Sequence, residues 1–331
     1  MRNMTAYKLL CDEKENESAI PVYIQLALGA LGNILAVIIL FVGRHEHQWQ
    51  SFYIFFTGLV LTDLVHNGVC YPLVLLRYIS DFTWCFSVKL CNFHSFMETF
   101  SHLASGMIIG AMTLDRYLYL RAIRKQTQEY GAQRKPYLAS LFAIILLASI
   151  LSSFHLLGLG NSQLYYPGSW CFLDFTDSSI GNKINAGIYS VFGLCIMMAA
   201  FVIGVKTIVV TCRNSEYQAL LLDHHRVTGI YDNHVRKFLV ISMVTFLLLW
   251  SPLLFDILFH ICGLSETNSR KELWLIRLMY LNTQINPWLY VILRRESLRR
   301  FFVLILKCKR CLCEKEEQTT GQESQDSGFY Q

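Results

Sequence analysis

Charged residues are scarce in this chain. Only 16% of its 331 residues are Asp, Glu, Lys or Arg, whereas 53% are hydrophobic, and the mean hydropathy is +0.37. Soluble globular domains usually carry about 25% charged residues. The composition therefore excludes an ordinary soluble protein.

Three other features are missing as well. Residues 1–19 lack the apolar core of a cleavable signal peptide, so we expect the first apolar run to act as the insertion signal. No internal repeats or paired broken helices are visible, although many transporters have them. The ten histidines show no metal-ligand spacing, and no catalytic set lies at one depth. We therefore expect no enzyme and no metal site, and a small-molecule transporter remains the main alternative of another class.

What the chain does contain is a series of apolar runs of about 20 residues or more, each long enough to cross a bilayer as a helix. The runs cover residues 20–42, 51–77, 91–120, 136–158, 184–212, 234–261 and 271–293. The third and seventh runs are the least apolar. We predict an all-α membrane protein built as a seven-helix transmembrane bundle.

The regions outside the bundle differ in character. Residues 1–19 form an N-terminal segment, and residues 307–331 form a polar tail that we expect to be disordered. Between the bundle and the tail, residues 294–306 are basic on one side and apolar on the other. This pattern predicts a short eighth helix on the inner membrane surface, so that the helical domain extends over residues 20–306.

Lys and Arg are concentrated in the segments that follow the odd-numbered apolar runs, which predicts an extracellular N-terminus and a cytoplasmic C-terminus. Two glycosylation sequons, at Asn3 and Asn16, lie on the predicted outer side. Cys308, Cys311 and Cys313 follow the basic amphipathic stretch on the inner side. They are candidates for palmitoylation, with three unmodified thiols as the alternative.

Several cysteines lie on the outer side, where disulfides persist. Cys91 opens the third helix and Cys171 lies in the second outer loop, and we expect these two to be joined, so that the loop is held over the bundle as a lid. Cys11, Cys85 and Cys262 also lie outside. A second disulfide among them is compatible with the sequence, which cannot assign it.

Polar residues inside transmembrane helices are costly and usually functional. Asp63 lies in the second helix, Ser105 in the third, and Asn282 and Asn286 in the seventh. Together they could coordinate a sodium ion or water, and a dry hydrogen-bonded cluster is the alternative. A sodium ion is the only cofactor that we consider.

A second group of polar residues lies at the inner ends of the helices. Asp115, Arg116 and Tyr117 fall at the cytoplasmic border of the third helix, and Asp232 should begin the sixth helix at the same border. An ion pair between Arg116 and Asp232 would hold the bundle closed. Pro252 interrupts the hydrogen bonding of the sixth helix and predicts a kink there.

The ordered set GALGN, LTDL, DRY, LWSP and NPWLY, with Cys91 and Cys171, resembles the marker set of the rhodopsin-like, or class A, G-protein-coupled receptors. The resemblance covers nearly the whole chain. It implies heterotrimeric G proteins, arrestin and receptor kinases as partners at the plasma membrane. It also implies roles in activation and G-protein coupling for Asp115, Arg116, Tyr117, Asp232, Trp250, Pro252, Asn286, Pro287 and Tyr290.

Within that family, the chain resembles the prostanoid receptors. The match rests on Pro-Gly-Ser-Trp-Cys-Phe at 167–172, on residues 72–78, and on Arg277 nine residues before Asn286. It is closest to the prostaglandin E receptors that raise cyclic AMP. The chain departs from that subfamily where Asn286 replaces an Asp, where Ser169 replaces a Thr and where a Trp precedes the sixth-helix proline.

A prostanoid is a long apolar acid, so its site needs a cation, nearby hydroxyl groups and an apolar cavity. Arg277 is the natural cation, because a carboxylate can bind its guanidinium at two points. The resemblance implies that Tyr78 and Ser169 hydrogen-bond beside it and that Trp170 closes the lid. The alternatives are a snorkelling Arg277 and a Trp170 that only packs at the membrane interface. We expect Arg77, the second cation nearby, to snorkel.

The expected function is that of a receptor for a prostanoid, prostaglandin E2 in particular, which couples to Gs and raises cyclic AMP. A receptor for another prostanoid or lipid acid that couples to Gi or Gq is the alternative. Membrane lipid is an expected partner and nucleic acid is not.

Overall fold

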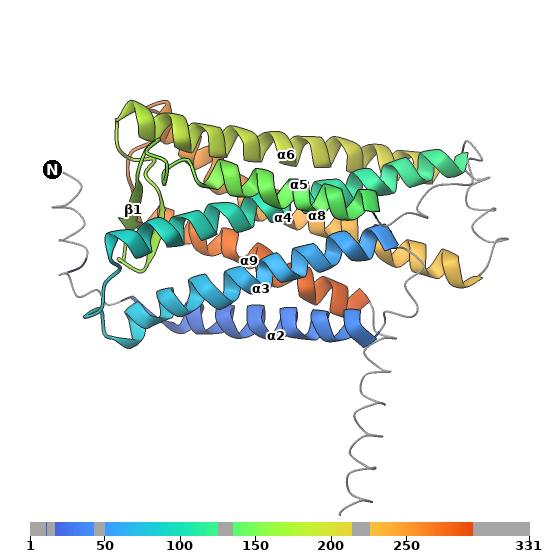
Figure 1. Ribbon diagram of the computed structural model, residues 1–331, viewed down its shortest axis with the longest axis horizontal. Coiled ribbons are helices and arrows are strands. Elements are labelled where there is room, and N and C mark those ends of the chain that lie inside the picture. Colours follow the sequence, from blue (N-terminus) through green and yellow to red (C-terminus); the bar gives the residue numbers. More distant parts are fainter. Residues whose placement is uncertain (1–10, 12–16, 43–49, 125–134, 214–225, 294–331) are drawn as a thin grey trace, which may run out of the picture.

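The computed structural model describes residues 11, 17–42, 50–124, 135–213 and 226–293. Seven long helices within these residues run side by side as one bundle (Figure 1). They are α2 (Ile20–Val42), α3 (Gln50–Ile79), α4 (Val88–Arg124), α5 (Lys135–Ser152), α6 (Ile180–Arg213), α8 (Arg226–Ile261) and α9 (Ser269–Leu293). The predicted seven-helix architecture is therefore present.

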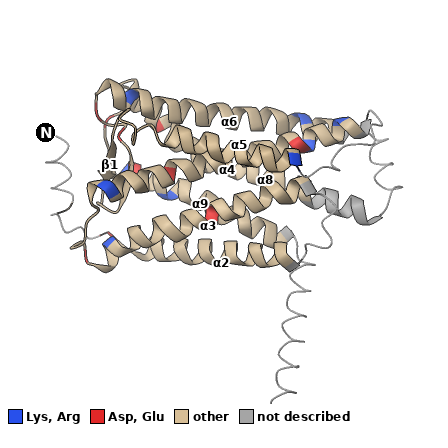
Figure 2. Ribbon diagram, in the orientation of Figure 1, with Lys and Arg blue, Asp and Glu red and all other residues tan. Residues whose placement is uncertain are grey.

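Five of these helices, α2, α3, α5, α6 and α8, are long and apolar enough to cross a membrane. The other two, α4 and α9, are the runs with the lowest hydropathy, and each contacts several neighbours. Helix α4 packs against α3, α5, α6 and α8, and α9 packs against α2, α3 and α8. Most Lys and Arg residues of the bundle lie near its two ends (Figure 2). Packing inside the bundle lets α4 and α9 carry polar residues that lipid would not tolerate.

The predicted fourth helix is too long at its C-terminal end. We expected it to extend to residue 158, but α5 ends at Ser152, and residues 153–159 form tight turns. The backbone N–H of Leu157 binds the carbonyl of Phe154, three residues earlier, at 3.1 Å, and Gly158 adopts a positive φ of 94°. Apolar residues continue through this segment, so the hydropathy pattern did not mark the end of the helix.

A small antiparallel hairpin covers the end of the bundle where α2 begins (Figure 1). Its strands are β1 (Ser162–Tyr165) and β2 (Trp170–Leu173), and Tyr165 pairs with Trp170 beside the turn. In the turn, Gly168 has a φ of 80°, a conformation that glycine adopts without steric cost. We call this hairpin the lid.

The middle of the bundle packs around Trp250 of α8, which is fully buried. Two glycines let the neighbouring helices approach it closely. A Cβ atom on Gly193 would lie 2.9 Å from the indole, and one on Gly106 would lie 2.7 Å from the ring of Phe246. The indole N–H of Trp250 donates to the hydroxyl of Tyr189 at 3.1 Å. The core is therefore tightly packed beside Pro252, which lies inside α8.

Several predictions fall outside the described residues. They are the eighth helix at 294–306, the tail at 307–331, the sequons at Asn3 and Asn16, and the cysteines Cys308, Cys311 and Cys313. The backbone of α8 includes Asp232, but the side chain of Asp232 is not described either.

Candidate functional site

The end of the bundle that the lid covers is held by two disulfides. We call it the outer end, because the sequence predicts that it is extracellular. Cys91 at the start of α4 is bonded to Cys171 in β2, as expected. The second disulfide, which the sequence left unassigned, joins Cys11 of the N-terminal segment to Cys85. Cys262 is a free, exposed thiol. The lid and the N-terminal segment are thus each covalently tied to the region where α4 begins.

The lid is packed by its own aromatic residues. Trp170 is buried, stacks on Tyr165 with ring centroids 4.6 Å apart, and donates its indole N–H to the carbonyl of Tyr166 at 2.8 Å. Ser169 is buried too. The hydrogen-bonding group of Trp170 is therefore used inside the lid, where it supports the turn.

Polar side chains tie the lid to α6. The carboxylate of Asp174 accepts hydrogen bonds from the backbone N–H of Asp177 at 3.1 Å and from the amide of Asn182 at 3.1 Å. Burial raises the pKa of Asp174 above its ordinary value. Burial, and then the nearby charge of Asp174, raise the pKa of the Tyr165 hydroxyl. That hydroxyl donates to the carbonyl of Leu173 at 2.8 Å and so remains neutral within the lid.

Arg277 of α9 lies inside the bundle and not at the lipid interface. It is 8% exposed, and its Nη2 donates to the hydroxyl of Tyr78 on α3 at 3.2 Å. The carboxylate of Glu17 lies 4.0 Å from the same nitrogen and accepts a hydrogen bond from the hydroxyl of Tyr166 at 3.1 Å. Sequence reasoning missed Glu17, because it comes from the N-terminal segment. The site thus brings a guanidinium, a hydroxyl and a carboxylate together beneath the lid.

Arg77 is placed differently from what the sequence suggested. We expected a snorkelling residue, but its side chain is fully buried. It donates to the backbone carbonyls of Phe82 and Trp84, and at 3.3 Å to that of Cys11. Because the chain turns back after α3, backbone carbonyls of the following loop surround the guanidinium and keep it away from the membrane surface. Arg77 therefore fixes the first outer loop.

One buried polar cluster had no counterpart in the sequence predictions. The carboxylate of Glu98 on α4 is bonded to His66 Nε2 at 3.0 Å and to the hydroxyl of Tyr280 at 2.8 Å. The rings of His94 and His102 lie on the same face of α4, one turn before and one turn after Glu98. These residues are all buried. The sequence analysis did not predict that three histidines converge on one buried carboxylate.

A sequence signal for this cluster did exist. His94, Glu98 and His102 are spaced by four residues and so share one helical face. Tyr280 lies one helical turn from Arg277 in α9, so the cluster is adjacent to the arginine site.

The predicted polar core in mid-bundle is assembled. Ser105 donates to Asp63 at 2.9 Å, and both residues are buried together with Asn282 and Asn286. Within the described residues, neither polar side-chain atom of Asn282 has a hydrogen-bond partner. A buried amide normally satisfies its hydrogen bonds, so these residues could hold an ion or water.

At the opposite end of the bundle, which we call the inner end, Asp115 and Arg116 contact different groups. Asp115 accepts a hydrogen bond from Ser51 of α3 at 2.9 Å. Arg116 is 5% exposed, and its guanidinium lies 4.8 Å from the ring centre of Tyr119. Tyr290 of the NPWLY segment packs on Phe56 with ring centroids 4.1 Å apart.

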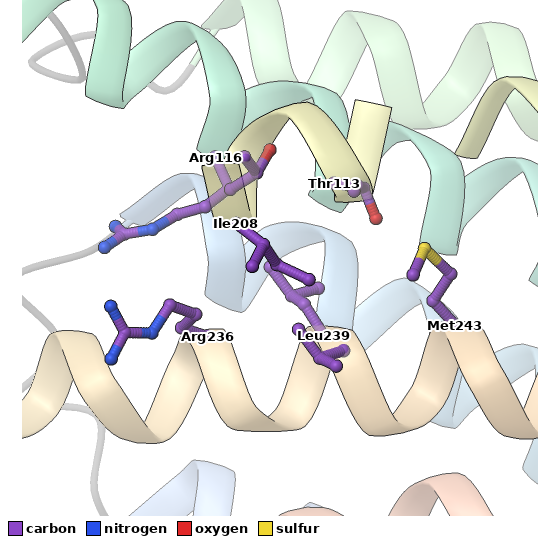
Figure 3. A pocket seen from close by; sticks show the side chains of 9 residues that line it. Thr113, Arg116, Ile208, Arg236, Leu239 and Met243 are labelled. Carbon is purple, nitrogen blue, oxygen red and sulfur yellow. The ribbon is translucent and has the colours of Figure 1, made fainter. Parts of the chain in front are cut away.

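Arg116 also lines a small cavity between α4, α6 and α8 (Figure 3). Arg236 of α8 faces the same cavity, and its guanidinium extends in the same general direction as that of Arg116 (Figure 3). Thr113, Ile208, Leu239 and Met243 complete most of the lining. Two cationic side chains thus border this cavity.

The sequence matches the family model of the 7 transmembrane receptors (rhodopsin family) over residues 32–290. The chain belongs to this family, which consists of receptors and not of enzymes. A solved structure of squid rhodopsin has the same fold, with a TM-score of 0.73 and 17% identity over 92% of this chain and 87% of that one. The fold and the family together define a membrane receptor.

Individual relatives show which receptors of this family the chain is similar to. The chain is 28% identical to the prostaglandin E2 receptor EP3 subtype of Oryctolagus cuniculus, over 85% of this chain and 74% of that protein. It is 23% identical to the prostaglandin E2 receptor EP4 subtype of Homo sapiens, over 92% of this chain and 70% of that protein. The chain therefore has prostaglandin E2 receptors of two subtypes among its relatives.

Proposed function

We propose that this chain is a plasma-membrane receptor for a prostanoid acid, prostaglandin E2 in particular, with its N-terminus outside the cell. The observation that carries the proposal is the setting of Arg277. A buried guanidinium is held beside the Tyr78 hydroxyl, beneath a disulfide-anchored lid. A carboxylate bound there would gain a charge-assisted, two-point contact in a site shielded from water.

The contact between Arg277 and Glu17 supports this reading. At 4.0 Å the two groups attract each other without a short hydrogen bond, so the guanidinium remains available for a better-placed anion. A ligand carboxylate would displace Glu17 and take its position. Tyr78 and Ser169 would then serve as neighbouring hydroxyl groups, and Trp170 would support the cover of the site through the lid.

We propose that signalling occurs through a heterotrimeric G protein at the inner end. Ligand binding favours a state in which α8 moves away from α4 and opens the cavity beside Arg116. Asp232 would hold Arg116 in the closed state, so Asp232→Ala should raise ligand-independent signalling. Arrestin and receptor kinases would act on the cytoplasmic tail, and membrane lipid would contact the exposed apolar faces of the helices.

The mid-bundle polar core is proposed to bind a sodium ion through Asp63, Ser105, Asn282 and Asn286. A carboxylate with hydroxyl and amide oxygens supplies the oxygen ligands that hard cations prefer. Sodium would be expected to favour the inactive state if opening at the inner end compresses this core.

A panel of prostanoids applied to cells that express this chain tests the function, with both rises and falls of cyclic AMP recorded. We expect a prostaglandin E2 response through Gs, with a rise in cyclic AMP. A fall would favour the alternative coupling to Gi. A receptor that responds to none of the acids, or equally to their methyl esters, would contradict the proposal.

A further inference from the structure

The buried cluster around Glu98 offers a set of metal ligands that the receptor function does not require. Cys70 of α3 and His94 and Glu98 of α4 each present one ligand atom, and these three atoms lie within 4.8 Å of one another. Cys70 is a free thiol, and all three side chains are buried. Thiolate sulfur, imidazole nitrogen and carboxylate oxygen are the three ligand types that Zn²⁺ uses in proteins.

The imidazole of His94 is already held in the form that binds a metal. Its Nδ1 lies 3.1 Å from the backbone carbonyl of Cys171, which can only accept a hydrogen bond. Nδ1 therefore carries the proton, and the lone pair of Nε2 points into the cluster, 3.6 Å from Glu98 Oε1. Within the described residues, His94 Nε2 has no hydrogen-bond partner. A backbone carbonyl that orients a ligating histidine is the usual outer support of a zinc site.

Glu98 is oriented by two further groups. His66 Nε2 lies 3.0 Å from Oε2, and the Tyr280 hydroxyl donates to Oε1 at 2.8 Å. Because the carboxylate oxygens have several lone pairs, Oε1 can keep its bond to Tyr280 and still bind a metal. These contacts fix the carboxylate between α3, α4 and α9.

A second grouping, His66, Glu98 and His102, is also compact. It is the weaker candidate, because His102 Nδ1 lies 2.7 Å from the backbone carbonyl of Glu98 and so carries a proton in this arrangement. The His102 nitrogen that lies near Glu98 is thus already a hydrogen-bond donor, whereas the His94 nitrogen that lies near Glu98, Nε2, has no hydrogen-bond partner among the described residues. The ligand set with Cys70 also includes a thiol, which favours zinc over magnesium or calcium.

We propose that Cys70, His94 and Glu98 bind one Zn²⁺ ion in the outer half of the bundle, with a fourth position for water or a ligand atom. Tetrahedral zinc with these ligands needs donor atoms about 3.5 Å apart, so small side-chain rotations suffice. The ion would link α3 to α4 and, through His94 and the carbonyl of Cys171, to the lid. The proposal is independent of which lipid the receptor binds.

Cobalt substitution tests the site, because a thiolate bound to Co²⁺ gives a charge-transfer absorption band. The full-length receptor is purified and stripped of metal with a chelator, in a background where Cys308, Cys311 and Cys313 are changed to Ser so that the tail cannot bind the ion. Titration with Co²⁺ should give this band with one equivalent bound, and Zn²⁺ should then remove it by competition.

The variants distinguish this site from other thiols. Cys70→Ser should abolish the band, whereas Cys195→Ser and Cys262→Ser, which change exposed free thiols, should leave it intact. Glu98→Gln keeps the shape of the side chain but removes a charged ligand. It should weaken Co²⁺ and Zn²⁺ binding by more than about tenfold, since even the loss of an outer support costs that much. It serves as the second test should Cys70→Ser fail to fold.

Thermal stability gives a readout that needs no absorption. Zn²⁺ that binds the folded state only should raise the melting temperature of the background protein as its concentration rises. The increase should vanish in Glu98→Gln and persist in Cys195→Ser. A band that survives Cys70→Ser, or a melting temperature that Zn²⁺ leaves unchanged in the background protein, would overturn the proposal.

Discussion

Arg77 and Arg277 are both buried arginines in the outer half of the bundle, yet their surroundings differ. Arg77 donates to backbone carbonyls of the loop that follows α3 and of Cys11. Arg277 faces two polar side chains, Tyr78 at 3.2 Å and Glu17 at 4.0 Å. Carbonyls of a folded loop cannot leave without unfolding it, whereas side chains can be exchanged for a ligand. The first arginine is therefore structural, and the second is suited to binding.

The largest effect should come from removing Arg277. Arg277→Ala should weaken binding of a prostanoid acid by about 2–5 kcal/mol, because a desolvated charge pair loses one member. Arg277→Lys should recover only part, since an ammonium cannot make the planar two-point contact. The measurement is radioligand competition with the acid and its methyl ester. Arg270→Ala, at an exposed arginine of the same helix, is the control.

Comparing the acid with its methyl ester shows whether Arg277 contacts the ligand carboxylate directly or affects binding only through a change in structure. Native receptor should bind the ester far more weakly than the acid, and Arg277→Ala should discriminate much less between the two. Equal losses on both proteins would mean that Arg277 does not hold the carboxylate, and the binding role that we contrast with Arg77 would fail.

Removing Arg77 should affect stability and not affinity. Arg77→Met keeps much of the apolar stem but leaves the Phe82 and Trp84 carbonyls without their donor, so we expect a loss of about 1.5–3 kcal/mol in the free energy of unfolding. The melting temperature and the surface expression report this loss. Arg121→Met, at an exposed position of α4, is the matched control. Full stability with weakened ligand binding would reverse the assignment of the two arginines.

A smaller change is expected at Tyr78. Tyr78→Phe removes the hydroxyl that accepts from Arg277, and we expect ligand affinity to fall by about 0.5–1.5 kcal/mol. Combined with Arg277→Ala, the loss should be less than additive, because both residues act on the same carboxylate. Tyr23→Phe, on an exposed tyrosine, should have no effect. Strict additivity of the two changes would show that Tyr78 acts elsewhere.

The smallest effect should come from Glu17. Glu17→Gln removes the charge that competes for Arg277, so the affinity for a prostanoid acid should rise by up to about 1 kcal/mol, the range of a partly exposed ion pair. Glu266→Gln changes an exposed acid near the outer end and is the control. A decrease in affinity would indicate that Glu17 contributes to the ligand site instead of competing with it.

The sequence predicted the seven helices because runs of apolar residues report membrane crossing directly. It also placed the disulfide between Cys91 and Cys171 and brought Asp63 near Ser105. It assigned the ligand-binding role to Arg277, but it expected Arg77 to snorkel, because only the path of the loop after α3 buries that guanidinium. It missed Glu98 as a centre because His66, Cys70 and Tyr280 come from other helices. Their convergence depends on how each helix is rotated within the bundle, and hydropathy does not specify that rotation.

The attachment of Glu17 at both sides has a further consequence. The residue lies between Cys11, which is bonded to Cys85, and the start of α2 at Ile20. A carboxylate tethered at both ends is present at Arg277 at a high effective concentration, on the order of millimolar for short linkers, however dilute the receptor is. To displace Glu17, a free lipid acid has to bind Arg277 strongly enough to compete with a carboxylate at that local concentration. Reduction of the Cys11–Cys85 bond would release one tether, and the receptor would then respond to lower concentrations of the acid without any change in its direct contacts.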